Sequence, residues 1–194
     1  YLGGFSALGF DVFAYDYPGY GLSSGSPSES GTYAAAESVY SYVTKDLGYP
    51  PERVFLLGRS LGGGPALKLA TSHPVGGLIL ESAFLSAQRV YMPFRVIPWD
   101  RFDNASKIRE STVPLLVVHG TQDEVVPFSH GKKLWDLAND PKLFFWIEGA
   151  GHNDVSLKGG VAYLETLCEF RKWVDRSVKD SRRAEESQGI GPKP

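Results

Sequence analysis

A serine flanked by glycines is the first feature of this sequence with an evident capacity for chemistry. The run Gly58-Arg59-Ser60-Leu61-Gly62 follows the pattern Gly-x-Ser-x-Gly, in which a strand turns sharply into a helix and exposes the serine hydroxyl as a nucleophile. The pattern alone is weak, because a chain of this composition contains it by chance in about one case in four. The context strengthens it, since an apolar run ends at Leu57 and helical spacing resumes at Pro65. The alternative is a glycine-rich turn that serves packing alone.

A serine hydroxyl becomes a good nucleophile when a base accepts its proton and an acid orients that base. The candidate base is His152, which lies in a glycine-containing segment directly after the last apolar run. The candidate acid is Asp123, which lies just past the end of another apolar run. Catalytic groups in open α/β sheets gather at the carboxyl ends of the strands, so we expect both side chains to meet Ser60 there.

Two other carboxylates compete with Asp123 for the role of the acid. Asp154 is too near His152 in the sequence to orient its ring easily, and we expect Glu124, adjacent to Asp123, to point elsewhere. We therefore prefer Asp123.

The remaining histidines have simpler interpretations. His119 ends an apolar run and is expected to be packed or hydrogen-bonded there, His130 to lie in the first turn of a helix, and His73 to end a helix before Pro74. No pair of histidines has the His-x-x-x-His spacing with acidic support that is typical of zinc sites, so we predict no metal site.

The composition narrows the class of protein. Lys and Arg number 20 and Asp and Glu 22, a net charge of −2, and no basic block could neutralise a run of phosphates, so we do not expect a nucleic-acid partner. The single cysteine, Cys168, excludes an intrachain disulfide. No apolar run approaches the length of about 20 residues that a transmembrane helix requires.

Short apolar runs alternate with longer segments of helical periodicity, which predicts an α/β fold with a mainly parallel sheet flanked by helices. The predicted strands are 11–15, 53–57, 77–81, 115–119 and 143–147. The predicted helices are 33–46, 61–71, 129–137 and 161–179.

Two segments fall outside this alternation. Residues 85–111 carry aromatic residues and two prolines, and we interpret them as a small cap whose aromatic side chains either contact an acyl chain or form core. Residues 181–194 have few apolar residues, and we expect a disordered tail after a domain that spans 1–180.

Four segments together resemble the α/β-hydrolase family, and within it the group that includes protein depalmitoylases and bud-emergence-like serine hydrolases. They occur in the order expected of that family, and the resemblance covers about residues 1–175. The segments are 15–25, 58–62, 123–131 and 148–154.

The resemblance implies roles for four residues. Ser60 would be the nucleophile, Asp123 the acid and His152 the base, and the backbone N–H of Leu61 would be one donor of the oxyanion hole. In the family, a glycine-containing loop after an earlier strand supplies the second donor, and no such strand or loop precedes Tyr1. We therefore expect an N-terminally truncated fragment that lacks the N-terminal strands and the second donor.

The resemblance also implies an activity: cleavage of a carboxylic ester or thioester, including acyl-protein thioesters, through an acyl-enzyme and without a cofactor. The sequence leaves open peptide or amide hydrolysis by the same triad, and a non-catalytic binding protein on a degenerate hydrolase fold. We expect a small-molecule or acylated substrate and a cytoplasmic location. Peripheral membrane contact, oligomeric state and the natural substrate stay open, and the N-terminal cysteine cluster of the depalmitoylases is not present in this sequence.

Overall fold

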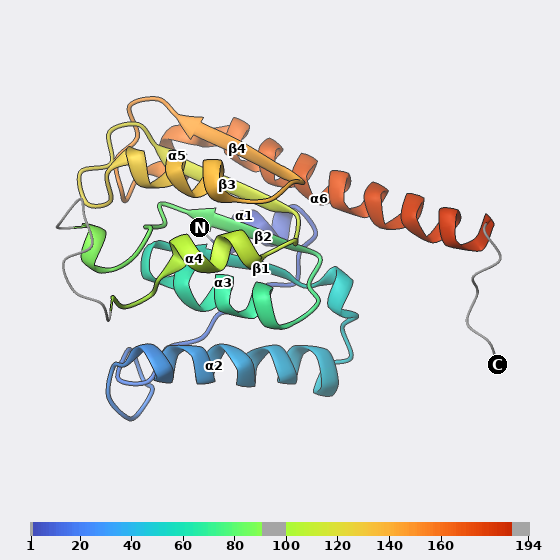
Figure 1. The fold of residues 1–194 in the computed structure, drawn as a ribbon, viewed down its shortest axis with the longest axis horizontal. Coiled ribbons are helices and arrows are strands. Elements are labelled where there is room, and N and C mark those ends of the chain that lie inside the picture. Colours follow the sequence, from blue (N-terminus) through green and yellow to red (C-terminus); the bar gives the residue numbers. More distant parts are fainter. Residues whose placement is uncertain (1, 91–99, 188–194) are drawn as a thin grey trace.

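Four parallel strands form the sheet of this protein. The structure, a computed structural model, describes residues 2–90 and 100–187. The strands lie in the order β1-β2-β3-β4, which is also their order along the chain, so that each connection crosses over the sheet (Figure 1). Their bounds are β1 Phe55–Arg59, β2 Gly77–Glu81, β3 Leu115–Gly120 and β4 Lys142–Ile147.

Helices cover both faces of the sheet. One face carries α3 (Gly63–Ser72), α4 (Asn104–Glu110) and α5 (Phe128–Leu137). The other face carries α1 (Leu2–Ala7) and the long α6 (Val155–Ser187), whose C-terminal half extends beyond the body of the molecule (Figure 1). Helix α2 (Glu29–Ser41) packs on α3 and continues into the π-helical turn η1 (Tyr42–Asp46). Short 3₁₀ turns complete the described elements: η2 Pro51–Arg53, η3 Ser60–Gly62 and η4 Gln88–Val90.

The buried strands explain why the sequence shows apolar runs instead of alternation. In β3, Leu115 and Val117 face α3, α4 and α5, whereas Leu116 and Val118 face α6, because successive side chains of a strand point to opposite faces. Every residue of β2 and β3 is buried. The sheet is therefore the centre of an α/β sandwich, as the sequence predicts.

The expected elements around the sheet agree closely with the observed ones. The strand predicted at 77–81 has its predicted bounds, and those at 115–119 and 143–147 are one residue longer. The strand predicted at 53–57 begins and ends two residues later. The four predicted helices correspond to α2 with η1, η3 with α3, α5, and α6.

The strand predicted at 11–15 is wrong, because this segment belongs to no sheet in the described structure. Its side chains Val12, Phe13 and Tyr15 are exposed instead of buried. A strand needs a neighbour for its backbone hydrogen bonds as well as a suitable composition. β1, at the edge of the sheet, pairs with β2 and not with 11–15.

The cap and tail segments differ in part from expectation. Within 85–111, residues 91–99 lie outside the described residues, and α4 packs between α3 and α5 as part of the helical layer. The prediction of disorder is wrong for 181–187, which continue α6, because Arg, Ala and Glu dominate this run and favour a helix. The remainder, 188–194, lies outside the described residues. In the described part of the chain, no helix combines the length and apolar composition that a membrane crossing requires.

The two-faced core predicts a large difference between two leucines. Leu116 is fully buried in β3, so Leu116→Ala should lower the free energy of unfolding by about 2–5 kcal/mol. Leu22 is fully exposed, and Leu22→Ala should change it by less than about 0.5 kcal/mol. Urea unfolding followed by circular dichroism measures both, and equal effects of the two substitutions would contradict this packing.

Candidate active site

Ser60 lies at a sharp turn between β1 and α3. Its φ of 51° places it in the left-handed region, which costs a non-glycine residue about 1–2 kcal/mol. The preceding Gly58 allows this turn, because a Cβ there would lie 2.6 Å from the carbonyl oxygen of Gly62 and 2.8 Å from the Cβ of Ala66. The tight strand-to-helix turn that the motif predicts is therefore present.

The glycines after Ser60 have different functions. A side chain on Gly64 would collide with the ring of Phe102, and a Cβ on Gly63 would lie 2.9 Å from the methyl group of Ala83. Gly62 has ordinary van der Waals room. Close backbone approach thus accounts for Gly63 and Gly64, which let α3 pack tightly against the segments that follow β2.

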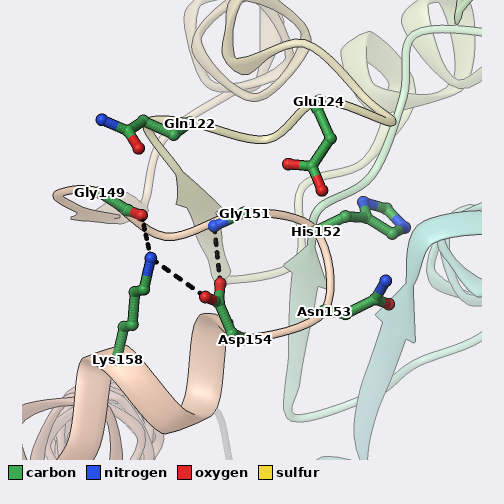
Figure 2. A pocket seen from close by; sticks show the side chains of 8 residues that line it. All are labelled: Gln122, Glu124, Gly149, Gly151, His152, Asn153, Asp154 and Lys158. Carbon is green, nitrogen blue, oxygen red and sulfur yellow. Dashed lines mark hydrogen bonds and ion pairs between the residues drawn. The ribbon is translucent and has the colours of Figure 1, made fainter.

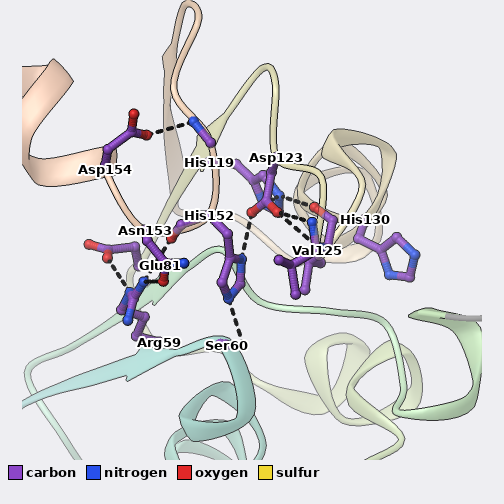
Figure 3. A network of polar contacts seen from close by, with 12 residues as sticks. Arg59, Ser60, Glu81, His119, Asp123, Val125, His130, His152, Asn153 and Asp154 are labelled. Carbon is purple, nitrogen blue, oxygen red and sulfur yellow. Dashed lines mark hydrogen bonds and ion pairs between the residues drawn. The ribbon is translucent and has the colours of Figure 1, made fainter.

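The structure brings the three predicted residues into one chain of hydrogen bonds (Figure 3). His152 Nε2 lies 3.1 Å from Ser60 Oγ, and His152 Nδ1 lies 2.8 Å from Asp123 Oδ2. A carboxylate can only accept, so Nδ1 carries the proton and Nε2 is free to accept from the serine hydroxyl. This arrangement can deprotonate Ser60 and stabilise the imidazolium that results.

The buried carboxylate of Asp123 is surrounded by hydrogen-bond donors of the protein. Its Oδ1 accepts hydrogen bonds from the N–H groups of Val125 (3.0 Å) and Val126 (2.8 Å), while Oδ2 faces His152 and lies 3.4 Å from Nε2 of His119. Burial alone would raise the pKa of Asp123, but the hydrogen bonds from His119, His152 and the Val126 N–H hold it well below its ordinary value. Asp123 is therefore ionised beside the histidine.

The competing carboxylates lie outside this chain of hydrogen bonds. Asp154 accepts from the Gly151 N–H at 2.7 Å and pairs with Lys158 at 3.1 Å, so it orders the loop that carries His152 (Figure 2). Glu124 is exposed and points into a pocket of about 370 Å³ beside that loop (Figure 2). The pocket is lined largely by polar groups, including Gln122, Asn153 and Lys158.

His119 has a role that the sequence analysis missed. It is completely buried at the end of β3, and its Nε2 donates to the carbonyl of Val126 at 2.9 Å. The same nitrogen lies 3.4 Å from Asp123, so His119 supports the turn that presents the acid. Its place four residues before Asp123 is the signal that could have indicated this contact.

The other two histidines lie where the sequence predicts, away from Ser60. His130 is in the first turn of α5, where its Nδ1 accepts from the N–H of Leu85 at 3.1 Å and burial lowers its pKa. His73 caps α3 and lies 2.6 Å from Glu37. Among the described residues, no group of His, Cys, Asp and Glu could hold a metal ion.

Leu61, whose N–H the resemblance suggests as an oxyanion donor, is the second residue of the turn η3. The first N–H groups of a helix lack a preceding carbonyl of the same helix to bond with. The side chain of Leu61 packs against the small cluster of Phe84, Phe102 and Val126. These aromatic rings are buried, so Phe102, within the segment predicted as a cap, is core.

Arg59, the residue before the nucleophile, was also missed as a site residue. Its guanidinium contacts the loop of His152 on one side and the buried Glu81 on the other (Figure 3). The signal available in the sequence was Glu81, a charged residue at the end of the otherwise apolar run 77–81.

The lowered pKa of Asp123 predicts how stability depends on pH. The ionised carboxylate stabilises the folded state fully above its unfolded pKa of 3.8, and this contribution is lost as the pH falls from there through the lowered folded pKa. Asp123→Asn should therefore lower the free energy of unfolding by about 2 kcal/mol at pH 7, and the difference from wild type should shrink below pH 3.8. Urea titrations from pH 7 to pH 3 measure this difference in the free energy of unfolding. Asp136→Asn, at an exposed position, is the control for losing one charge. A difference that grows as the pH falls would contradict the assignment.

Comparison with known proteins relates this geometry to a family. The profile of the alpha/beta hydrolase fold matches residues 4–105. The alpha/beta hydrolase domain-containing protein 17B of Homo sapiens is 41% identical over 172 residues, which cover 88% of this chain and 59% of that relative. The protein 17C of Mus musculus is 39% identical over 172 residues, which cover 88% of this chain and 53% of the relative. The chain thus spans between 53% and 59% of the length of these two relatives.

Solved structures of low identity share the fold. A monoacylglycerol lipase of Paleococcus ferrophilus has a TM-score of 0.67 and 21% identity, over 87% of this chain and 85% of that one. A CIB-like hydrolase of Thermoplasma acidophilum has a TM-score of 0.64 and 22% identity, over 88% of this chain and 76% of that one. The resemblance that the four sequence segments indicate is confirmed, and the chain belongs to the alpha/beta hydrolase fold family.

Proposed function

We propose that this protein is a serine hydrolase that cleaves a carboxylic ester or thioester through an acyl-enzyme. The observation that carries the proposal is the unbroken hydrogen-bond chain from Ser60 through His152 to Asp123. A serine in left-handed backbone, an adjacent imidazole in the accepting tautomer and a buried ionised carboxylate are the parts that nucleophilic acyl transfer requires.

The reaction proceeds in two steps. Ser60 Oγ attacks the carbonyl carbon as its proton passes to His152 Nε2, the negative oxygen faces the N–H of Leu61, and the leaving alcohol or thiol departs with the proton from His152. Water then attacks the acyl-enzyme and gives a proton to His152. The acid is released as Ser60 recovers that proton. Asp123 stays ionised throughout and stabilises the imidazolium.

Leaving-group chemistry and the resemblance to the depalmitoylase group both favour an ester or thioester over an amide as the substrate. A thiol or alcohol leaves an acyl group more readily than an amine does, so its departure demands less of His152 as the general acid. The four segments that resemble the depalmitoylase group support an acyl-protein thioester as the substrate, and the 41% identity to the protein 17B supports the same branch.

Labelling with a fluorescent fluorophosphonate tests whether Ser60 is activated, without needing the substrate. The protein should label, and Ser60→Ala should abolish the signal because no other serine faces His152 in the described structure. Ser82→Ala is the matched control, because Ser82 also has a positive φ, 48°, directly after a parallel strand but is fully buried. Ser82→Ala should label as wild type does.

The labelling is done both on this chain and on the protein as its gene encodes it. Labelling that survives Ser60→Ala would reject Ser60 as the nucleophile. A folded protein that does not label in either form would favour a binding role for the fold. If labelling occurs, hydrolysis of a palmitoyl-thioester peptide is compared with that of the matching amide peptide, and faster cleavage of the amide would overturn the ester or thioester assignment.

A further inference from the structure

Arg59 joins the nucleophile's strand to the loop that carries the base. Its Nη2 donates to the backbone carbonyl of His152 at 2.7 Å and to Oδ1 of Asn153 at 2.9 Å (Figure 3). These residues follow β4, whereas Arg59 ends β1, and the two strands lie at opposite ends of the sheet order. The guanidinium therefore links the first strand of the described sheet to the loop that follows its last strand.

The other edge of the guanidinium contacts the buried carboxylate of Glu81, which in turn contacts α6. Nε of Arg59 lies 3.2 Å from Oε1 of Glu81, whose side chain is 1% exposed, and Tyr163 of α6 donates to Oε2 of Glu81 at 2.6 Å. A buried carboxylate is costly unless it is paired and hydrogen-bonded. The hydrogen bond from Tyr163 thus holds Glu81 in place against the Nε edge of Arg59.

The acceptors around Arg59 require its shape as well as its charge. The guanidinium is a rigid planar fork, so it can donate to Glu81 from Nε and to the His152 loop from Nη2 at once. A lysine would present a single flexible ammonium group and could not span both sides with fixed geometry.

The loop after β4 is tied at Gly149 and Gly151, whose N–H groups donate to Thr121 and Asp154, but these bonds do not act on the backbone of His152 itself. Its glycines Gly149 and Gly151 give it conformational freedom, and Gly149 has a φ of 72°. The hydrogen bond to Asp123 orients the imidazole ring, but a ring can also be held in the wrong place if its backbone shifts. The bond from Arg59 acts on the backbone carbonyl of His152 itself.

We propose that Arg59, buttressed by Glu81 and Tyr163, is a positioning residue that holds His152 Nε2 within hydrogen-bond distance of Ser60 Oγ. The inference rests on the proposed function of Ser60 as the nucleophile. Arg59 does not touch the reacting atoms. It acts by tying the segment next to Ser60 to the backbone of the base, and misplacement of a catalytic group by about 1 Å can cost on the order of 10²-fold in rate.

Arg59→Met tests the bridge, but it removes a cation that pairs with the buried Glu81 and is expected to lower stability. The double variant Arg59→Met with Glu81→Gln also removes the buried carboxylate charge and should recover most of the melting temperature. If Arg59 positions His152, this double variant should keep kcat for an ester at about 10- to 100-fold below wild type, with KM within about twofold. A role in stability alone predicts instead that kcat recovers together with the melting temperature.

Two further variants sharpen the test. Arg59→Lys keeps the positive charge beside Glu81 but not the fork, so kcat should remain well below wild type. Arg171→Met is the matched control, because Arg171 also donates to a backbone carbonyl, but that of Leu8 at 2.8 Å, which belongs to none of the turns that carry Ser60, Asp123 or His152. Arg171→Met should leave kcat unchanged.

The outcomes separate this inference from the function on which it rests. Each variant is assayed by ester turnover and by the rate of fluorophosphonate labelling of Ser60, in the protein as its gene encodes it. If the wild type shows no labelling that depends on Ser60, the proposed function fails and the inference fails with it. If the wild type labels and either the double variant or Arg59→Lys labels at the wild-type rate, the positioning role is overturned while the proposed function stands.

Discussion

The parallel register of the four strands is the constraint on which the candidate site depends. Because all four strands point the same way, the turns that follow β1, β3 and β4 meet at one edge of the sheet, and these turns carry Ser60, Asp123 and His152. At ordinary strand spacing β1 and β4 lie about 14 Å apart, so the turns must also bend toward each other. The sheet supplies a common edge, and the loops supply the remaining reach.

Buried polar groups turn that common edge into a defined site. Asp123 can remain ionised in the interior because three donors from its own turn and the His152 loop contact its two oxygens, with His119 of β3 at 3.4 Å. These donors belong to the folded chain itself, so they need no reorganisation to support a positive His152. The strained backbone at Ser60 is held in the same way, by close packing at Gly58 on one side and Gly63 on the other.

The sequence predicts those parts of the molecule that depend on local pattern. Apolar runs indicate the strands 77–81 and 115–119 because both faces of these strands are buried. The motif around Ser60 and the positions of Asp123 and His152 after strand ends indicate the hydrogen-bond chain. The segment 11–15 shows the limit of this reasoning, because composition reports a tendency to be buried but does not report whether a neighbouring strand is there to pair with. The contacts of His119 and Arg59 were missed for a related reason, since they depend on which turns the tertiary fold brings together.

Arg59 and Glu81 illustrate how stability and function can be told apart at such an edge. The Glu81 carboxylate is buried, whereas the Arg59 side chain is 39% exposed. Such an ion pair contributes little net stability, and apolar residues of similar volume would often hold the strands together equally well. Strand cohesion therefore does not explain why a guanidinium lies between β1, β2 and the loop after β4. The acceptors do explain it: a fixed carboxylate on one side and the backbone carbonyl of His152 on the other require a planar donor that reaches both. The physical advantage of this pair lies in direction, because it ties the backbone carbonyl of His152, in a glycine-containing loop, to the strands β1 and β2.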